Sequence, residues 1–270
     1  MSIINLICLT VVLIIILFVI YILYFRSANY DIDWSKLQLG NNSRAENRIE
    51  NNCFIILRNL TLMNYNKKIL IPPYFKNPEY VSNRSQLLMF KFEYGNQLYL
   101  IFAGTYPGTT LLDAFDIRYD TISLGIENSK CHVHKGFNKI HKKYILPKLK
   151  EYGLLDIDKD DKKKEVILAG YSLGGALAIL SMNAIISSGN EYMIKKCVTF
   201  GAPKLGDLRM HDYYKTYNKL VRIEYNKDII PRFSAREFYN VGKKVILESS
   251  SDLKGIIGNH YNSYEEHFCN

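Results

Sequence analysis

The pattern of apolar and polar positions begins with one long apolar run at the N-terminus. From Ile3 to Phe25 only Asn5 and Thr10 interrupt the run, and neither side chain is charged. The run exceeds the roughly 20 residues that cross a bilayer, and Tyr21 and Tyr24 lie where an aromatic belt would be. The pattern therefore predicts a transmembrane helix within residues 1–26.

A cleavable signal peptide is the alternative interpretation of this run. Such a peptide needs a charged n-region and an apolar core of about 7–15 residues, whereas no Lys or Arg precedes this run. We therefore expect a retained single-pass membrane anchor. Arg26 and Lys36 follow the run, so the positive-inside rule favours a cytoplasmic location for the rest of the chain.

The residues after the anchor show shorter apolar segments with helical or strand-like spacing. Residues 27–70 are expected to form a juxtamembrane linker and a helix, because apolar positions between Asn42 and Tyr65 recur at helical spacing. Strand-like runs at Gln86–Tyr94 and Gln97–Ala103 meet at Gly95-Asn96, which predicts a hairpin.

The second half of the chain alternates helical and strand-like segments. A helix is predicted from His134 to about Tyr152, with a kink at Pro147. Short apolar runs predict strands at Val166–Ala169, Cys197–Phe200, Leu220–Tyr225 and Lys243–Leu247. This alternation predicts an α/β fold with a mostly parallel central sheet, flanking helices and a preceding antiparallel hairpin, over residues 71–270. Residues 106–130 are expected to form a long irregular connection.

The strand at Val166–Ala169 leads directly into the pattern Gly170-x-Ser172-x-Gly174. A serine on a sharp strand-to-helix turn projects its hydroxyl from the sheet edge, and flanking glycines let the turn close. Small and apolar residues as far as Ile186 predict a buried helix after the turn. The same five-residue pattern also occurs by chance in loops, but its position between a strand and a helix favours a nucleophile elbow.

A serine nucleophile needs a histidine base and a carboxylate that orients the base. In this architecture the chain order is Ser, then Asp or Glu, then His. Asp228 follows the strand at Leu220–Tyr225, and His260 lies further along in a polar loop. The sequence therefore suggests a triad of Ser172, Asp228 and His260. The alternatives are Asp207 or Asp252 as the acid and His267 as the base.

An enzyme of this kind also needs two backbone donors for the developing oxyanion. The N–H of Leu173, which follows the nucleophile, is the first candidate. Gly104-Thr105 ends an earlier predicted strand and could supply the second, although it could equally be an ordinary turn.

Composition adds little to this functional interpretation. The net charge of +9 comes partly from lysine runs that resemble solvated surface, and no nucleic-acid-binding motif is present. The five cysteines are scattered without disulfide or zinc-ligand spacing. We expect no metal, no cofactor and no nucleic-acid partner.

Six motifs, in their order along the chain, resemble those of the class 3 (fungal-type) lipase family of the α/β-hydrolase superfamily. They are Phe102-Ala103-Gly104-Thr105, Val133-His134-Lys135-Gly136-Phe137, Gly170 to Ala178, Thr199 to Asp207, Asn226 to Pro231, and Asn259-His260 with Tyr264. The resemblance implies Ser172 as nucleophile, Asp228 as acid, His260 as base, and Thr105 with Leu173 at the oxyanion hole. Two positions depart from the family: Tyr171 stands where His is usual, and Tyr264 lies four residues after His260 instead of three.

The resemblance also implies that the segment after Thr105 is a lid. Leu111, Leu112 and Phe115 are spaced to lie on one face of a short helix, with Pro107-Gly108 before it and Gly125 after it as expected hinges. A fixed surface helix is the alternative.

The expected function is that of a membrane-anchored serine hydrolase that cleaves carboxylic esters of lipids, such as tri- or diacylglycerols, through an acyl-enzyme. Its partners would be a lipid ester at a membrane or droplet interface and the membrane that holds the N-terminal helix. The alternatives are a phospholipase A1 or an acyltransferase with the same triad, and a catalytically inactive α/β-hydrolase scaffold that serves as an interaction module.

Overall fold

The structure of the 270-residue chain is a computed structural model. It describes residues 34–35, 37, 46–66, 70–83, 86–104, 116–125, 129–156, 164–232, 237–248, 260 and 262–269. The expected anchor at residues 1–26, Thr105, and the expected lid residues Leu111, Leu112 and Phe115 lie outside the described residues. None of the helices in the described ranges is both long and apolar enough to cross a membrane.

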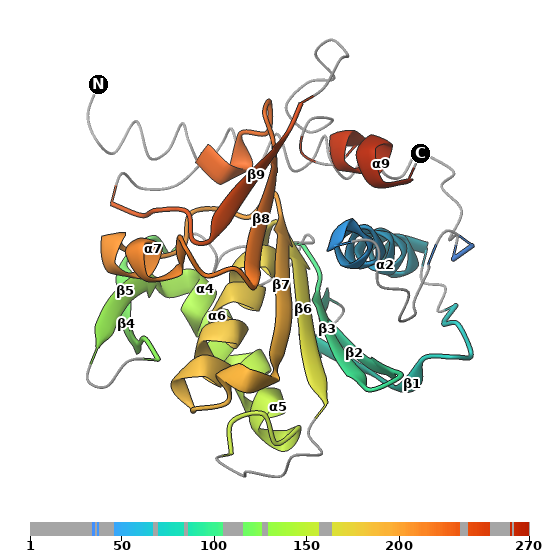
Figure 1. Cartoon of the computed structure of the whole chain (residues 1–270), viewed down its shortest axis with the longest axis horizontal. Coiled ribbons are helices and arrows are strands. Elements are labelled where there is room, and N and C mark those ends of the chain that lie inside the picture. The colour runs from blue at the N-terminus through green and yellow to red at the C-terminus, as the bar shows by residue number, and fades with distance from the viewer. Residues whose placement is uncertain are drawn as a thin grey trace.

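Seven of the described strands form one sheet, in the order β1-β2-β3-β6-β7-β8-β9 (Figure 1). The strands from β3 to β9 in this order are parallel, and β1 and β2 are added antiparallel at the β3 edge. The predicted hairpin is β2 and β3. The predicted α/β-hydrolase fold with a mostly parallel sheet is thus confirmed. The bounds are β1 Lys76–Asn83, β2 Gln86–Tyr94, β3 Gln97–Phe102, β6 Glu165–Tyr171, β7 Ile194–Phe200, β8 Leu220–Tyr225 and β9 Lys243–Leu247.

Helices cover both faces of this sheet (Figure 1). One face carries α4 Lys135–Ile140, α5 Leu146–Glu151 and α6 Leu173–Ser187, and the other carries α2 Glu46–Asn66 and α9 Asn262–Cys269. An apolar core lies on each face of the sheet, and successive residues of β6 point alternately into one core and the other. The strand is therefore apolar throughout after its first residue. This double burial explains the continuous apolar run in the sequence.

Helix α2 packs against the sheet through its apolar face. The side chains of Cys53, Ile56 and Leu60 are fully buried there, at the spacing that the sequence pattern predicts. Burial of each large apolar side chain contributes about 1.5–3 kcal/mol. The ring of Phe54 also contacts the rings of Tyr264 and Phe268 on α9. Packing of α2 therefore helps to hold the C-terminal helix against the sheet.

The predicted helix from His134 to about Tyr152 is present as three consecutive segments. α4 and α5 are separated by a π-helical turn, η1 His141–Ile145. Pro147 lies in the first turn of α5, where its missing N–H and fixed φ are tolerated. The irregularity expected from Pro147 therefore takes the form of a widened turn directly before it.

The expectation of an irregular connection over residues 106–130 is wrong for its second part. Strand β4, Tyr119–Ser123, pairs antiparallel with β5, Lys130–His134, in a separate two-stranded sheet. None of the five residues of β4 is buried, so no apolar pattern marks the strand. The short helix α7, Leu208–Tyr214, was also not predicted; the 3-10 turns are η2 Glu191–Met193 and η3 Ile230–Arg232.

Candidate active site

Ser172 occupies the tight turn between β6 and α6. Its φ of 54° and ψ of −126° are unusual for a residue with a side chain. Such a backbone conformation costs about 1–3 kcal/mol and persists only where its surroundings enforce it. Here the Ser172 N–H donates to the carbonyl oxygen of Phe200 at 2.9 Å, and the Gly175 N–H donates to the carbonyl oxygen of Ser172 at 2.9 Å. The turn is therefore held both by β7 and by the first turn of α6.

The glycines of the elbow motif are required by close backbone contacts. A Cβ atom on Gly170 would lie 2.1 Å from the carbonyl oxygen of Gly174, and one on Gly174 would lie 2.1 Å from the carbonyl oxygen of Phe102. A Cβ atom on Gly175 would lie 2.6 Å from Cβ of Ala202. Each distance is too short for any larger residue, so the Gly-x-Ser-x-Gly-Gly spacing is a steric requirement of this turn.

His260 and Asp228 are brought together from elements far apart in the sequence. Nδ1 of His260 lies 2.7 Å from Oδ2 of Asp228. Asp228 follows β8 at the carboxyl end of the parallel strands, and His260 lies just before α9. With the Asp228 carboxylate as the acceptor, Nδ1–H of His260 is the donor, and the neutral imidazole in this tautomer has its lone pair on Nε2.

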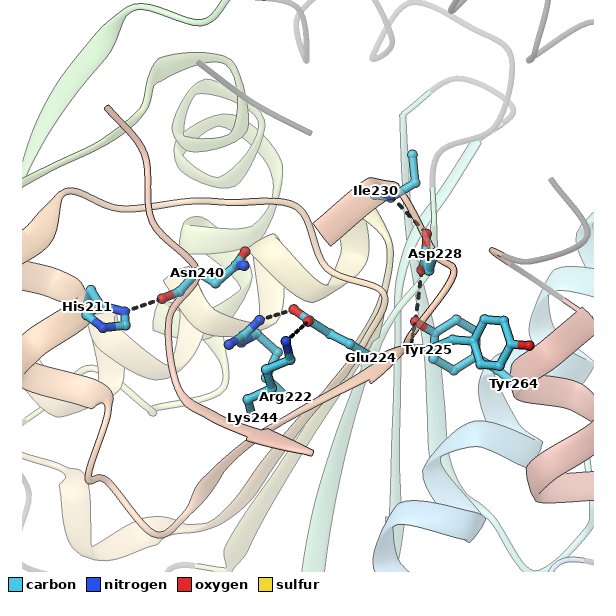
Figure 2. Close-up of polar contacts among 9 residues, drawn as sticks. All are labelled: His211, Arg222, Glu224, Tyr225, Asp228, Ile230, Asn240, Lys244 and Tyr264. Atoms are coloured by element: carbon cyan, nitrogen blue, oxygen red, sulfur yellow. Dashed lines mark hydrogen bonds and ion pairs between the residues drawn. The ribbon is translucent and has the colours of Figure 1, made fainter. Parts of the chain in front are cut away.

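The carboxylate of Asp228 is fixed by two further donors (Figure 2). The Tyr264 hydroxyl donates to Oδ2 at 2.8 Å, and the Ile230 N–H donates to Oδ1 at 2.9 Å. The Tyr264 hydroxyl also accepts the N–H of Tyr225 at 2.9 Å. Burial, with the nearby Asp228 carboxylate, raises the pKa of Tyr264 well above its ordinary value, so the hydroxyl stays protonated and can donate. The buried Asp228 carboxylate is thereby held in one orientation.

The end of β7 connects Ser172 with the His260–Asp228 pair. Phe200, the hydrogen-bonded neighbour of Ser172, precedes Gly201, and a Cβ atom on Gly201 would lie 2.8 Å from Cε1 of His260. Nε2 of His260 is buried and has no hydrogen-bond partner among the described residues. A general base must present a nitrogen of this kind, and in enzymes without substrate the hydrogen bond from the serine to the base is often long or not yet formed.

Of the two backbone donors expected for an oxyanion, the N–H of Leu173 lies at the start of α6. Leu173 is the first residue of α6, so its N–H has no acceptor within the helix. β3 pairs with β6 up to Phe102 and Gly170, which brings Ala103 and Gly104 beside the elbow. Gly104 packs against Tyr171, and Thr105 follows it outside the described residues.

The rival acid and base lie in other surroundings. His267 is exposed on α9, and its ring contacts Phe268. Asp207 caps α7, because its Oδ1 accepts the N–H of Met210 at 3.0 Å. Its Oδ2 accepts the N–H of His132 on β5 at 2.8 Å. Asp252 lies outside the described residues.

The other face of β8 carries a charged cluster that the sequence did not reveal (Figure 2). Arg222 and Glu224 are both buried and form an ion pair, and Lys244 of β9 lies 3.4 Å from Glu224. Burial lowers the pKa of Arg222 to about 10, so its guanidinium stays charged at neutral pH. Removing one partner of a buried ion pair destabilises the fold, because it leaves the other charge buried without a partner.

Two site residues had no role in the sequence interpretation. Gly201 gives room to the His260–Asp228 pair, and Tyr171 contacts His260 directly. A signal for Tyr171 existed, because it is the residue of the elbow that departs from the family pattern. A signal for Gly201 lay in the Phe-Gly-Ala-Pro motif that follows β7.

Comparison with solved structures agrees with this fold. A fungal lipase in complex with an inhibitor is 18% identical, with 70% of this chain and 76% of that chain covered and a TM-score of 0.52. The lipase from Rhizopus microsporus var. chinensis is 19% identical over 80% of this chain and 83% of that chain, with a TM-score of 0.51. The Rhizomucor miehei lipase with its propeptide is 14% identical over 87% and 86%, also with a TM-score of 0.51. At these identities the likeness shows the fold alone.

Comparison at the level of sequence identifies the family. Among curated proteins, phospholipase A1-II 1 of Oryza sativa subsp. indica is 24% identical over 96 residues, which is 33% of this chain and 24% of the rice protein. This chain thus matches only about a quarter of that relative's length. The family model for class 3 lipases matches residues 99–238, just over half of the 270 residues. The chain belongs to the class 3 lipase family.

Proposed function

We propose that this protein hydrolyses carboxylic esters of lipids through an acyl-enzyme on Ser172. The observation that carries the proposal is the hydrogen bond of 2.7 Å between His260 and Asp228, together with the elbow conformation of Ser172. Nothing in this site requires a metal or a cofactor to activate the serine, because a buried carboxylate and a neutral imidazole suffice.

In the acylation step Ser172 Oγ attacks the ester carbonyl while Nε2 of His260 accepts the hydroxyl proton. The imidazolium that forms is stabilised by Asp228, which is already oriented by Tyr264 and Ile230. The C–O bond to the alcohol then breaks, and Nε2 returns the proton to the departing oxygen. The products are an acyl ester on Ser172 and a free alcohol.

Deacylation repeats the sequence with water as the nucleophile. Nε2 takes a proton from water as the water oxygen attacks the acyl carbonyl, and the proton passes to Ser172 Oγ as the bond to serine breaks. A carboxylic acid leaves and the free enzyme is restored. In both steps the carbonyl oxygen becomes negatively charged, and the N–H of Leu173 at the N-terminus of α6, with Thr105, would stabilise it.

Membership of the class 3 lipase family supports a lipid ester as the substrate class. The match to a rice phospholipase A1 favours a phospholipid ester as the second candidate. An acyltransferase would use the same acyl-enzyme and replace water by another alcohol. Hydrolysis assays of the purified chain on tri-, di- and monoacylglycerols and on phospholipids would rank these substrates.

The proposal places the enzyme on a membrane through residues 1–26. It rests on the apolar run from Ile3 to Phe25, which contains no charged residue, and the positive charges that follow the run favour a cytoplasmic catalytic domain. Extraction of membranes with alkaline carbonate tests the anchor. The full chain should stay in the membrane pellet, and its release into the supernatant would show that the run does not span.

A lid over the site is proposed from the sequence of Leu111, Leu112 and Phe115. The described chain resumes at Asp116, whose carbonyl oxygen accepts the N–H of Gly136 at 2.9 Å, so a moving segment would end there. Gly125 is packed against Ile186 beyond β4 and is therefore poorly placed as a hinge.

The lid can be tested by changing all three apolar residues to Ser. A lid predicts loss of activity on emulsified triacylglycerol with retained activity on a soluble short-chain ester. Equal losses on both substrates would identify these residues as part of the scaffold.

The catalytic proposal is tested by covalent labelling with a fluorophosphonate. The probe forms a stable bond with an activated serine, and peptide mass spectrometry should locate the label on Ser172. The Ser172→Ala variant should not label, whereas Ser82→Ala, which changes an exposed serine on β1, should label normally. A folded wild-type protein that does not label would favour the inactive scaffold.

A further inference from the structure

Tyr171, the residue before the nucleophile, links the elbow to the histidine. Its hydroxyl donates to the backbone carbonyl oxygen of His260 at 2.6 Å. Its ring also stacks on the imidazole of His260, with ring centroids 4.8 Å apart and planes 27° from parallel. The side chain is 5% exposed, so both contacts are shielded from water.

The ring of Tyr171 is confined on its other sides as well. A Cβ atom on Gly104 would lie 2.9 Å from Cδ1 of Tyr171, so the backbone two residues after β3 packs closely against the ring. The ring also meets that of Tyr264 edge-on, with centroids 6.3 Å apart. Tyr171 therefore has little freedom to change its rotamer, and it can act as a fixed surface for the imidazole.

The hydrogen bond to Asp228 alone does not fix the orientation of the imidazole. It holds Nδ1, but the ring can still turn about the line between Nδ1 and Oδ2. Nε2 lies off that line, so a rotation of this kind would change the direction in which its lone pair points. A stacked aromatic face restricts the plane of the ring, and the same face favours the cationic imidazolium that forms during each step.

We propose that Tyr171 is a positioning residue that sets the plane and backbone position of His260 so that Nε2 faces Ser172. This inference rests on the proposed function, and it assigns the role to two separable groups, the ring and the hydroxyl. His, the usual residue of the family at this position, is shorter and carries no phenolic hydroxyl. The hydrogen bond from a phenolic hydroxyl to the His260 carbonyl oxygen therefore depends on the tyrosine of this chain.

The proposal is tested with Tyr171→Leu and Tyr171→Phe on a soluble p-nitrophenyl ester. Loss of the ring in Tyr171→Leu should lower kcat by about tenfold or more, because small displacements of a catalytic group are costly, while KM stays within about twofold. Tyr171→Phe keeps the ring and should lose about threefold in kcat, a loss typical of a single neutral hydrogen bond. Unchanged kcat in both variants would overturn the proposal.

A double-mutant cycle with His260→Ala separates positioning from a general structural effect. If Tyr171 acts through His260, then Tyr171→Leu should cause no further loss of kcat once His260 is Ala. Equal fold losses in the two backgrounds would overturn the proposal, since they would mean that Tyr171 acts on the elbow or the fold instead. The residual activity of His260→Ala, measured at high enzyme concentration, is sufficient for this comparison.

Two controls keep the result decisive. Urea unfolding should show that each variant is folded at the assay temperature. If Tyr171→Leu is unfolded, the double-mutant cycle with His260→Ala is repeated with Tyr171→Phe. Equal fold losses of kcat in the two backgrounds of that cycle would overturn the proposal. The proposed function itself fails by a different outcome, near-normal kcat of His260→Ala with Tyr171 intact.

Discussion

A Cβ atom placed on Gly201 would lie only 2.7 Å from Oδ2 of Asp228, the oxygen that accepts the hydrogen bond of His260. Gly201 directly follows β7, and its φ of +57° lies in the left-handed region that favours glycine. The position is therefore restricted twice, once by its backbone and once by the pair of side chains that it accommodates.

The first prediction concerns the change Gly201→Ala. The new methyl group should push the Asp228 carboxylate and the His260 ring apart, so kcat should fall by about tenfold or more. The left-handed backbone should add a stability loss of about 1–2 kcal/mol. Kinetics on a soluble ester and urea unfolding measure the two effects.

Gly153→Ala is the matched control for this prediction. Gly153 has a φ of +68°, and a Cβ atom there would meet nothing within 4 Å. The variant should lose similar stability but keep its activity. If Gly201→Ala is as active as Gly153→Ala, Gly201 does not shape the site.

The second prediction distinguishes His260 from His267. His260→Ala should lower kcat by several orders of magnitude, because the members of a triad act as a unit. His267 is exposed, and the histidine that bonds to Asp228 is His260, so His267→Ala should have little effect on kcat. The same ester assay on both variants ranks them, and the reverse ranking would move the base to His267.

The third prediction concerns stability in acid. His141 is buried in the π-helical turn, and burial lowers its pKa to about 3. The unfolded chain takes up a proton on this residue below about pH 6.5, while the folded state does not, so stability is lost as the pH falls from about 6.5 toward 3. Between pH 7 and pH 5 the loss should be about 2 kcal/mol.

His141→Gln tests this origin, because glutamine does not titrate and can still bond to the hydroxyl of Ser181. Between pH 7 and pH 5 the free energy of unfolding, measured with urea, should fall by about 2 kcal/mol less for the variant than for the wild type. The contribution of His134, whose pKa burial also lowers, to about 4, is the same in both proteins and cancels. Identical acid losses in the two proteins would contradict the assignment.

The sheet and its buried helices could be predicted from the sequence because their apolar patterns are strong. β6 is apolar after its first residue, α6 consists mostly of small and apolar residues, and the hairpin of β2 and β3 is marked by Gly95-Asn96. β4 could not be found in this way because none of its side chains is buried. Its pairing with β5 depends on contacts that only the folded chain creates.

The side chains of the site were predictable only in part. The elbow is a local motif, and the order Ser, Asp, His follows from the architecture, so Ser172, Asp228 and His260 could be named together. The packing of Tyr171 on His260 joins residues 89 positions apart, and no periodicity encodes it. The buried pair of Arg222 and Glu224 was likewise hidden, because charged residues in a strand ordinarily indicate a solvent-exposed face.

The measurement that tests the central claim most directly is the turnover of Ser172→Ala on a carboxylic ester. Wild type, Ser172→Ala and the control Ser82→Ala should be compared on a p-nitrophenyl ester and on a lipid ester, with unfolding in urea as the check on folding. We predict that Ser172→Ala is folded and loses several orders of magnitude in kcat on both substrates, while Ser82→Ala keeps wild-type turnover. Near-wild-type hydrolysis by a folded Ser172→Ala would contradict the account.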